Sequence, residues 1–73
     1  MEVIFTQHVK ERLVKREITE KEVIDAVCYP DRLYHSQGKY FAQKNSGRGK
    51  IEVVYEKIVN KSKYLNIITV YWL

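Results

Sequence analysis

His8, Arg12 and Arg16 follow one another at intervals of four residues near the start of the chain. On a helix this spacing stacks the three side chains along one stripe. Cationic neighbours and a helix N-terminus both favour a neutral imidazole at His8, which suits a general base toward a ribose 2′-OH. Arg12 would then bind the scissile phosphate through paired hydrogen bonds and stabilise its developing charge. One hypothesis for the stripe is therefore a catalytic site.

The same stripe also has a purely structural explanation. A histidine directly after an N-cap helps to complete the end of a helix, and long arginine side chains cover a core with their stems. The arginines would alternatively pair with acidic residues of a second helix, namely Glu20, Glu22 and Asp25. The residue types and their spacing leave both explanations open.

A second stretch combines four basic residues with two aromatic ones and contains no acid. It consists of Lys39, Tyr40, Phe41, Lys44, Arg48 and Lys50. Cations that neutralise phosphates, beside rings on which bases stack, are typical of proteins that bind single-stranded RNA. We therefore expect nucleic-acid binding here, with Arg16 contributing, although a solvated strand with its aromatics in the core fits the pattern equally. His35, across a turn from Lys39, is a further candidate.

Positive charge is concentrated in the second half of the chain. Residues 1–34 carry six Lys or Arg against seven Asp or Glu, and residues 35–73 carry seven against two, so the halves differ as −1 and +5. Such an excess favours an anionic partner such as nucleic acid, although basic surfaces also serve solubility. The length of 73 residues and the 45% apolar content predict one globular domain over residues 1–73.

Several classes of site are missing from the sequence. Cys28 is the single cysteine, so no intrachain disulfide or thiol cage for zinc can form, and we expect it to be a small core residue. There are no paired carboxylates, no Gly-rich phosphate loop and no metal-ligand spacing, so we expect no cofactor and no metal site. Without a signal peptide or an apolar run of about 18 residues, a cytoplasmic protein with no membrane contact is expected.

The first half of the chain carries helix signals. An apolar run at 3–5 predicts an edge strand that ends at a Thr6 N-cap, followed by a helix over 7–17. Thr19 and Glu22 form a capping-box pattern that predicts a second helix over 20–28, ending before Pro30. The expected buried stripes are Val9, Leu13 and Val14 on the first helix, and Val23, Ile24 and Val27 on the second.

After Pro30 the period changes to that of strands, predicted over 32–35, 39–44, 50–59 and 64–73. The last of these is apolar on both faces, with Ile68, Val70 and Trp72 against Leu65, Ile67 and Leu73, which indicates an interior strand. The expected fold is α+β in the order β-α-α-β-β-β-β, with both helices on one face of an antiparallel meander sheet.

The segment FTQHVKERLVKREITEKEVIDAVCYPD, residues 5–31, resembles the opening of a prokaryotic domain family of unknown function, DUF4258. The "TVY" at residues 69–71 resembles the family's apolar C-terminal strand. That family is distantly similar to the RelE-, ParE- and BrnT-type toxins of toxin–antitoxin systems. The second likeness implies a RelE-like fold and a metal-independent endoribonuclease acting on single-stranded or messenger RNA.

The toxin resemblance also implies a catalytic role for Tyr71, beside His8 and Arg12, because related toxins often keep a tyrosine near the C-terminus. Alternation places Tyr71 on the same face as Thr69 and Leu73, so burial is equally open. The implied partners are RNA and a cognate antitoxin protein that pairs with an edge strand. The alternative function is a non-catalytic domain that binds nucleic acid or a protein, and the sequence leaves the oligomeric state open.

Overall fold

The computed structural model describes residues 2–58 and 61–73, with the backbone alone described at 61 and 62. Two helices and five strands follow the predicted order. The elements are β1 (Glu2–Ile4), α1 (Gln7–Arg16), α2 (Glu20–Cys28), β2 (Arg32–Ser36), β3 (Lys39–Asn45), β4 (Lys50–Ile58) and β5 (Lys61–Trp72). The predicted α+β class is therefore confirmed.

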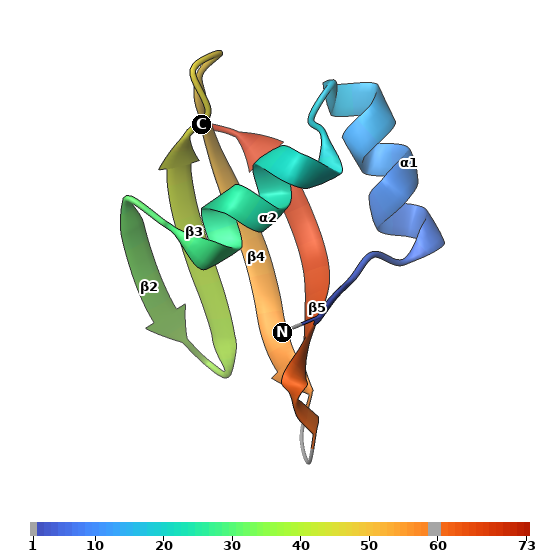
Figure 1. Cartoon of the computed structure of the whole chain (residues 1–73), viewed down its shortest axis with the longest axis vertical. Helices are drawn as coiled ribbons and strands as arrows, with labels where there is room; N and C mark the ends of the chain where they lie inside the picture. Colours follow the sequence, from blue (N-terminus) through green and yellow to red (C-terminus); the bar gives the residue numbers. More distant parts are fainter. Residues whose placement is uncertain (1, 59–60) are drawn as a thin grey trace.

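The strands form one sheet in the order β1-β5-β4-β3-β2, with α2 crossing in front of it and α1 lying beside β5 (Figure 1). β2 to β5 are an antiparallel meander, as expected. β1, however, pairs with β5 in parallel, so the sheet is mixed rather than antiparallel throughout. Strand direction was not readable from the sequence because β1 and its partner β5 are separated by most of the chain. The apolar β5 is interior, as predicted.

Local capping fixes both helices. The Thr6 hydroxyl accepts a hydrogen bond from the Val9 N–H at 3.3 Å, and α1 ends where Glu17 adopts a left-handed conformation with φ 55°. At α2, the Glu22 N–H donates to the Thr19 hydroxyl at 3.1 Å, while the Thr19 N–H donates to the Glu22 carboxylate at 2.9 Å. The capping box read from the sequence is thus confirmed.

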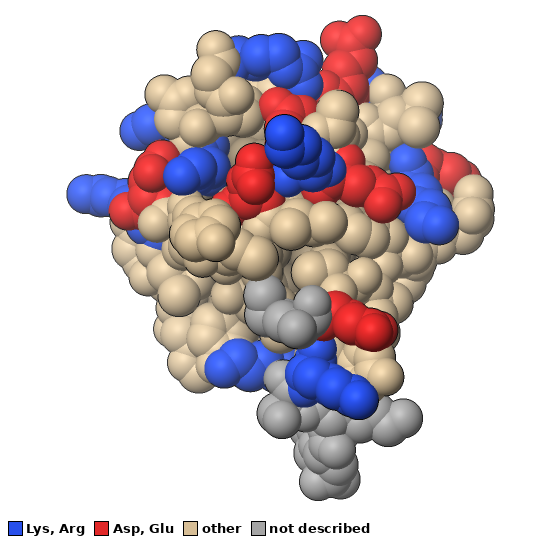
Figure 2. All heavy atoms as spheres, in the orientation of Figure 1, with Lys and Arg blue, Asp and Glu red and all other residues tan. Residues whose placement is uncertain are grey.

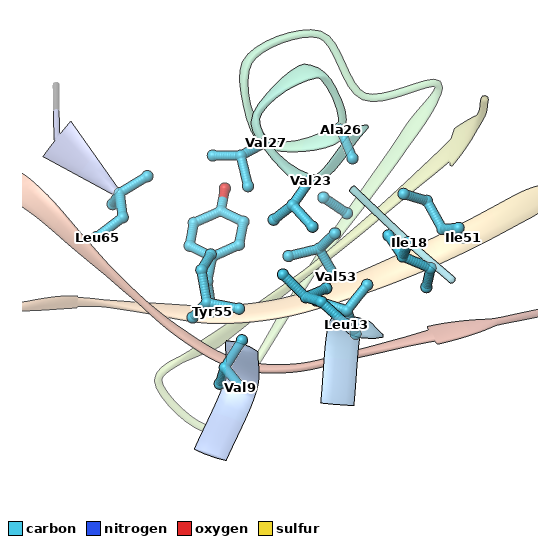
Figure 3. Packing of buried hydrophobic residues seen from close by; sticks show 13 residues of the cluster. Val9, Leu13, Ile18, Val23, Ala26, Val27, Ile51, Val53, Tyr55 and Leu65 are labelled. Atoms are coloured by element: carbon cyan, nitrogen blue, oxygen red, sulfur yellow. The ribbon is translucent and has the colours of Figure 1, made fainter. Parts of the chain in front are cut away.

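The core lies between the helices and one face of the sheet (Figure 3). Its buried members from the helices and the turn between them are Val9, Leu13, Ile18, Val23, Ala26 and Val27, and those from the sheet are Ala42, Ile51, Val53, Tyr55, Leu65, Ile67 and Val70.

Three residues expected in the core lie outside it. Val14 is 79% exposed, Ile24 is 40% exposed, and Cys28 is exposed at the end of α2. α1 contacts β5, whereas α2 contacts β3 and β4, so each helix covers little of the sheet and buries a narrow stripe. On α2, Ala26 occupies the core position in place of Ile24.

The expected regular alternation of β5 is wrong, because a β-bulge interrupts it. Thr69 pairs with Val54 and Ile67 pairs with Tyr55, so Ile68 is an extra residue without an opposite partner in β4. Leu65, Ile67, Val70 and Trp72 therefore all face the helices, rather than dividing between the two faces.

The alternate side chains of the strands point to the other side, which we call the helix-free face. Within the described residues no helix covers this face, because both helices pack on the core side. Thr69 and Tyr71 share it, as predicted. None of the helices described is both long and apolar enough to span a bilayer.

Candidate nucleic-acid interface

His8 and Arg12 are exposed on α1, where they line a shallow hollow with Glu11 and Lys15. Among the described residues neither has a hydrogen-bond or ion-pair partner. α1 packs on the core side of β5, whereas Tyr71 lies on the helix-free face of the same strand. The sheet therefore separates His8 and Arg12 from Tyr71, and the three predicted catalytic residues do not form one site.

Arg16 continues the stripe but turns inward. Its guanidinium donates to the Val70 carbonyl at 2.5 Å, and the Trp72 indole N–H donates to the Arg16 carbonyl at 2.6 Å. These two bonds fasten the end of α1 to the end of β5. Neither Arg12 nor Arg16 pairs with the acids of α2 in the described structure, so that part of the structural expectation is wrong.

Arg48 is the residue that pairs with α2. Its guanidinium binds the Glu22 carboxylate at 2.7 Å, donates to the Glu17 carbonyl at 2.6 Å and lies 5.3 Å from the centre of the Trp72 ring. The hydrogen bond from Arg48, with a smaller contribution from the Thr19 N–H, lowers the pKa of Glu22 to about 2. Arg48 is therefore already engaged by the protein itself.

Tyr40 and Lys44 also have partners within the fold. The Tyr40 ring stacks on His35 with centres 4.3 Å apart and on Tyr55 with centres 5.3 Å apart. Lys44 lies 3.7 Å from the Asp31 carboxylate. Because His35 and Tyr55 flank Tyr40 from neighbouring strands, little of its ring is left for a base.

The helix side of the molecule does not offer a continuous basic surface. Figure 2 shows lysine and arginine side chains next to aspartate and glutamate side chains on the face that carries α2. A phosphate backbone on this face would meet both signs of charge. The two remaining lysines of the predicted set, Lys39 and Lys50, belong by alternation to the helix-free face.

Strand register places the side chains of the helix-free face in transverse rows. One row, here the polar row, crosses four strands and consists of Arg32, Gln43, Glu52 and Tyr71. The next row, here the apolar row, consists of Tyr34, Phe41, Val54 and Thr69. A polar and a partly aromatic row therefore lie side by side.

Glu52 is the centre of the polar row and only 9% exposed. The Gln43 amide donates to one carboxylate oxygen at 2.8 Å, and the Tyr71 hydroxyl donates to the other. The bond to Glu52 raises the pKa of Tyr71 to about 12, and burial adds to the shift. Tyr71 is therefore protonated at neutral pH.

A polar hollow opens at one end of the polar row. It is lined by Asp31, Arg32, Gln43, Lys44, Asn45 and Lys50, and we call it the cationic hollow because it contains three cations and one acid. Asp31 is already engaged there, since it accepts the Asn45 N–H at 2.9 Å and faces Lys44. The hollow has the charge and the donors that a phosphate group requires.

Sequence reasoning missed Arg32, Tyr34, Gln43 and Glu52. Each is a single polar or aromatic residue in a strand pattern, and only the register across β2 to β5 brings them together. One signal was available in the sequence: the alternation of β4 puts the Glu52 side chain on the other face of the strand from Ile51 and Val53. Among the described residues no three His, Cys, Asp or Glu side chains gather where they would hold a metal ion.

Neither the curated proteins nor the solved structures contain a significant match to this chain. Residues 5–72, however, match the family model described as "Domain of unknown function (DUF4258)". The match covers nearly the whole chain, including both helices and the meander that builds the helix-free face. The resemblance noted in residues 5–31 is thus confirmed, and this chain belongs to the DUF4258 family.

Proposed function

We propose that this domain binds single-stranded RNA on its helix-free face. The observation that carries the proposal is the cationic hollow at the end of a sheet face with exposed aromatic side chains. Tyr34 is 47% exposed and Phe41 is half-buried in the adjoining apolar row. Rings on an open sheet face give bases a stacking surface, and cations beside them neutralise the phosphates.

Arg32 connects the two parts of this surface. Its guanidinium lines the cationic hollow and donates to the Tyr34 hydroxyl at 3.0 Å. A nucleotide whose base stacks on Tyr34 would therefore have its phosphate next to a positioned arginine. Lys50 lies in the hollow and Lys39 near the opposite end of the same face, so a strand of RNA crossing the sheet would meet cations at both ends.

Fluorescence anisotropy with a labelled single-stranded RNA tests the proposal. The double variant Arg32→Ala Lys50→Ala should bind more weakly, and the slope of log affinity against log salt should fall by about 0.7 for each lost phosphate contact. Tyr34→Ala should weaken binding by about 5- to 100-fold through the loss of one stacked base.

The matched control is Lys10→Ala Lys21→Ala, which removes the same charge from exposed positions on the two helices. It should retain most of the affinity, because the local hollow and not the net charge provides the contacts. Equal weakening in the two double variants, or binding that is insensitive to salt, would rule out the helix-free face as the binding site.

A second candidate function, association with a partner protein, is favoured by the open edge of β2. All five residues Arg32–Ser36 are exposed, and within the described chain β2 has a strand neighbour on one side only. In the toxin hypothesis an antitoxin would add a strand here in the cytoplasm and cover Arg32. The test is co-expression with the product of an adjacent reading frame, followed by amide exchange. Unprotected amides at 32–36 would count against it.

A further inference from the structure

The Glu52 carboxylate has no evident structural reason for its place on the helix-free face. It is nearly buried, and in the described part of the chain no lysine or arginine forms an ion pair with it. Its hydrogen bonds come from two neutral groups, the Gln43 amide and the Tyr71 hydroxyl. Burial of a carboxylate without a cation is costly, and side chains that break this rule are expected mainly at functional sites.

Its neighbours suggest what the carboxylate does. Gln43 both binds Glu52 and lines the cationic hollow, and Lys50 is two residues before Glu52 on the same face of β4. Residues two apart on a strand are about 7 Å from each other, so a phosphate bound by Lys50 would be next to the residue that carries the carboxylate. A carboxylate repels the phosphate itself, but it accepts a hydrogen bond from the ribose 2′-OH, which DNA lacks.

We propose that Glu52 and Tyr71 are the base and the acid of an RNA-cleaving site, an inference that rests on the RNA binding proposed above. Glu52 takes the proton of the 2′-OH, and the 2′-oxygen forms a bond to the adjacent phosphorus. The bond from phosphorus to O5′ breaks, and O5′ receives the proton of the Tyr71 hydroxyl. Arg32 and Lys50 stabilise the negative charge that grows on the phosphate oxygens.

The hydrogen bond between the two residues closes the cycle. Tyr71 recovers a proton from Glu52 through this bond, so both side chains return to their starting states. The products are a 2′,3′-cyclic phosphate and a 5′-hydroxyl, and neither water nor an oxidant is consumed. Because the Glu52 carboxylate raises the pKa of Tyr71, protonation of Glu52 removes that cause and makes Tyr71 a better acid during the reaction.

This site differs from the one expected from the sequence. Tyr71 keeps its predicted role, whereas His8 and Arg12 are replaced by Glu52 and the cations of the hollow, because the sheet lies between α1 and Tyr71. The two hypotheses share Tyr71, but one needs His8 and Arg12 and the other needs Glu52. Substituting His8 and Arg12, or Glu52 alone, therefore distinguishes between them.

The experiment uses the purified protein, a labelled single-stranded RNA and its all-2′-deoxy counterpart, with EDTA present. The wild-type protein should cut the RNA to cyclic-phosphate ends and leave the deoxy strand intact. Glu52→Gln and Tyr71→Phe should each slow cleavage by at least about 100-fold while RNA affinity changes by less than about threefold. The controls are His8→Ala Arg12→Ala and Glu56→Gln, both of which should cleave at the wild-type rate.

Glu56 is a close match for Glu52, because it lies on the same strand and face and accepts a hydrogen bond from the Asn66 amide at 3.3 Å.

RNA that is bound but never cut would overturn the inference and leave the proposed binding intact. No RNA binding would overturn both. Cleavage by folded Glu52→Gln or Tyr71→Phe at the wild-type rate would also overturn the inference. If either variant fails to fold, Glu52→Asp replaces it and should still cut slowly, since the carboxylate is kept but withdrawn.

Discussion

Arg48 joins three parts of the molecule that are far apart in the sequence: the loop after β3, the start of α2 and the ring of Trp72. The capping box at Thr19 and Glu22 was predictable because its members are three residues apart. Its third member, Arg48, follows Glu22 by 26 residues and was instead predicted to bind RNA. A cation in a basic stretch looks the same in the sequence whether it faces solvent or a carboxylate.

The first prediction concerns acid stability and Glu22. Its pKa in the folded protein, about 2, is below its ordinary value of 4.5, so the carboxylate stabilises the fold above about pH 4.5. That contribution is lost as the pH falls toward 2. Glu22→Gln should lower the free energy of unfolding by about 1 kcal/mol at neutral pH. Urea denaturation should show the difference shrinking below pH 4, and a constant difference would contradict the assignment.

The second prediction concerns Glu52, for which function and stability should separate. Glu52→Gln removes a nearly buried charge that has no cation, while a neutral oxygen can still accept the Tyr71 hydroxyl. We expect the free energy of unfolding at neutral pH, measured by urea denaturation, to change by less than about 1 kcal/mol. Tyr71→Phe should cost about 1–3 kcal/mol, because it leaves one oxygen of the nearly buried carboxylate without a donor while the Gln43 amide still binds the other. A loss of several kcal/mol in Glu52→Gln would indicate a structural residue.

The bulge in β5 lets one strand serve two surfaces. Leu65, Ile67 and Val70 all face the core, although the two intervals between them are unequal, and Tyr71 still points to the helix-free face. Deletion of Ile68 restores regular alternation without turning any side chain over, so the domain should lose no more than about 2 kcal/mol. Insertion of one alanine between Val70 and Tyr71 turns Tyr71 and Trp72 over and should cost at least about 3 kcal/mol. Thermal melts of the two variants test this, and equal losses would contradict the register.

At the scale of elements, the sequence predicted existence, type and order well. Caps and periods act within a few residues, so both helices and the meander were visible, as was the interior place of β5. Strand direction at β1, the bulge at Ile68 and the exposure of Val14 and Ile24 were not visible. Each depends on which surface an element meets, and that surface is built by residues elsewhere in the chain.

The charge distribution belongs to the whole molecule. The excess of the second half predicted an anionic partner, but the fold divides those cations among different tasks. Arg48 fastens α2, Lys44 faces Asp31, and Lys50 lines the cationic hollow with Arg32, which comes from the charge-balanced half. The sequence thus led us to expect a basic surface, and our proposal that it lies on the helix-free face depends on the register of the strands.

Because Arg32 and Lys50 line the cationic hollow and do not belong to the core, the proposed RNA binding predicts a change in the stability of the whole domain. A ligand that binds only the folded state, at a free concentration of about 100 times its Kd, adds about 2.7 kcal/mol to the free energy of unfolding. For a domain of this size that raises Tm by roughly 10–20 °C. The 2′-deoxy strand, or RNA with the Glu52→Gln variant, separates this binding effect from cleavage. Arg32→Ala Lys50→Ala should keep the Tm of the free protein, because neither side chain belongs to the core, and should lose most of the RNA-induced shift. A full shift in that variant, measured by differential scanning fluorimetry, would place the RNA on another face.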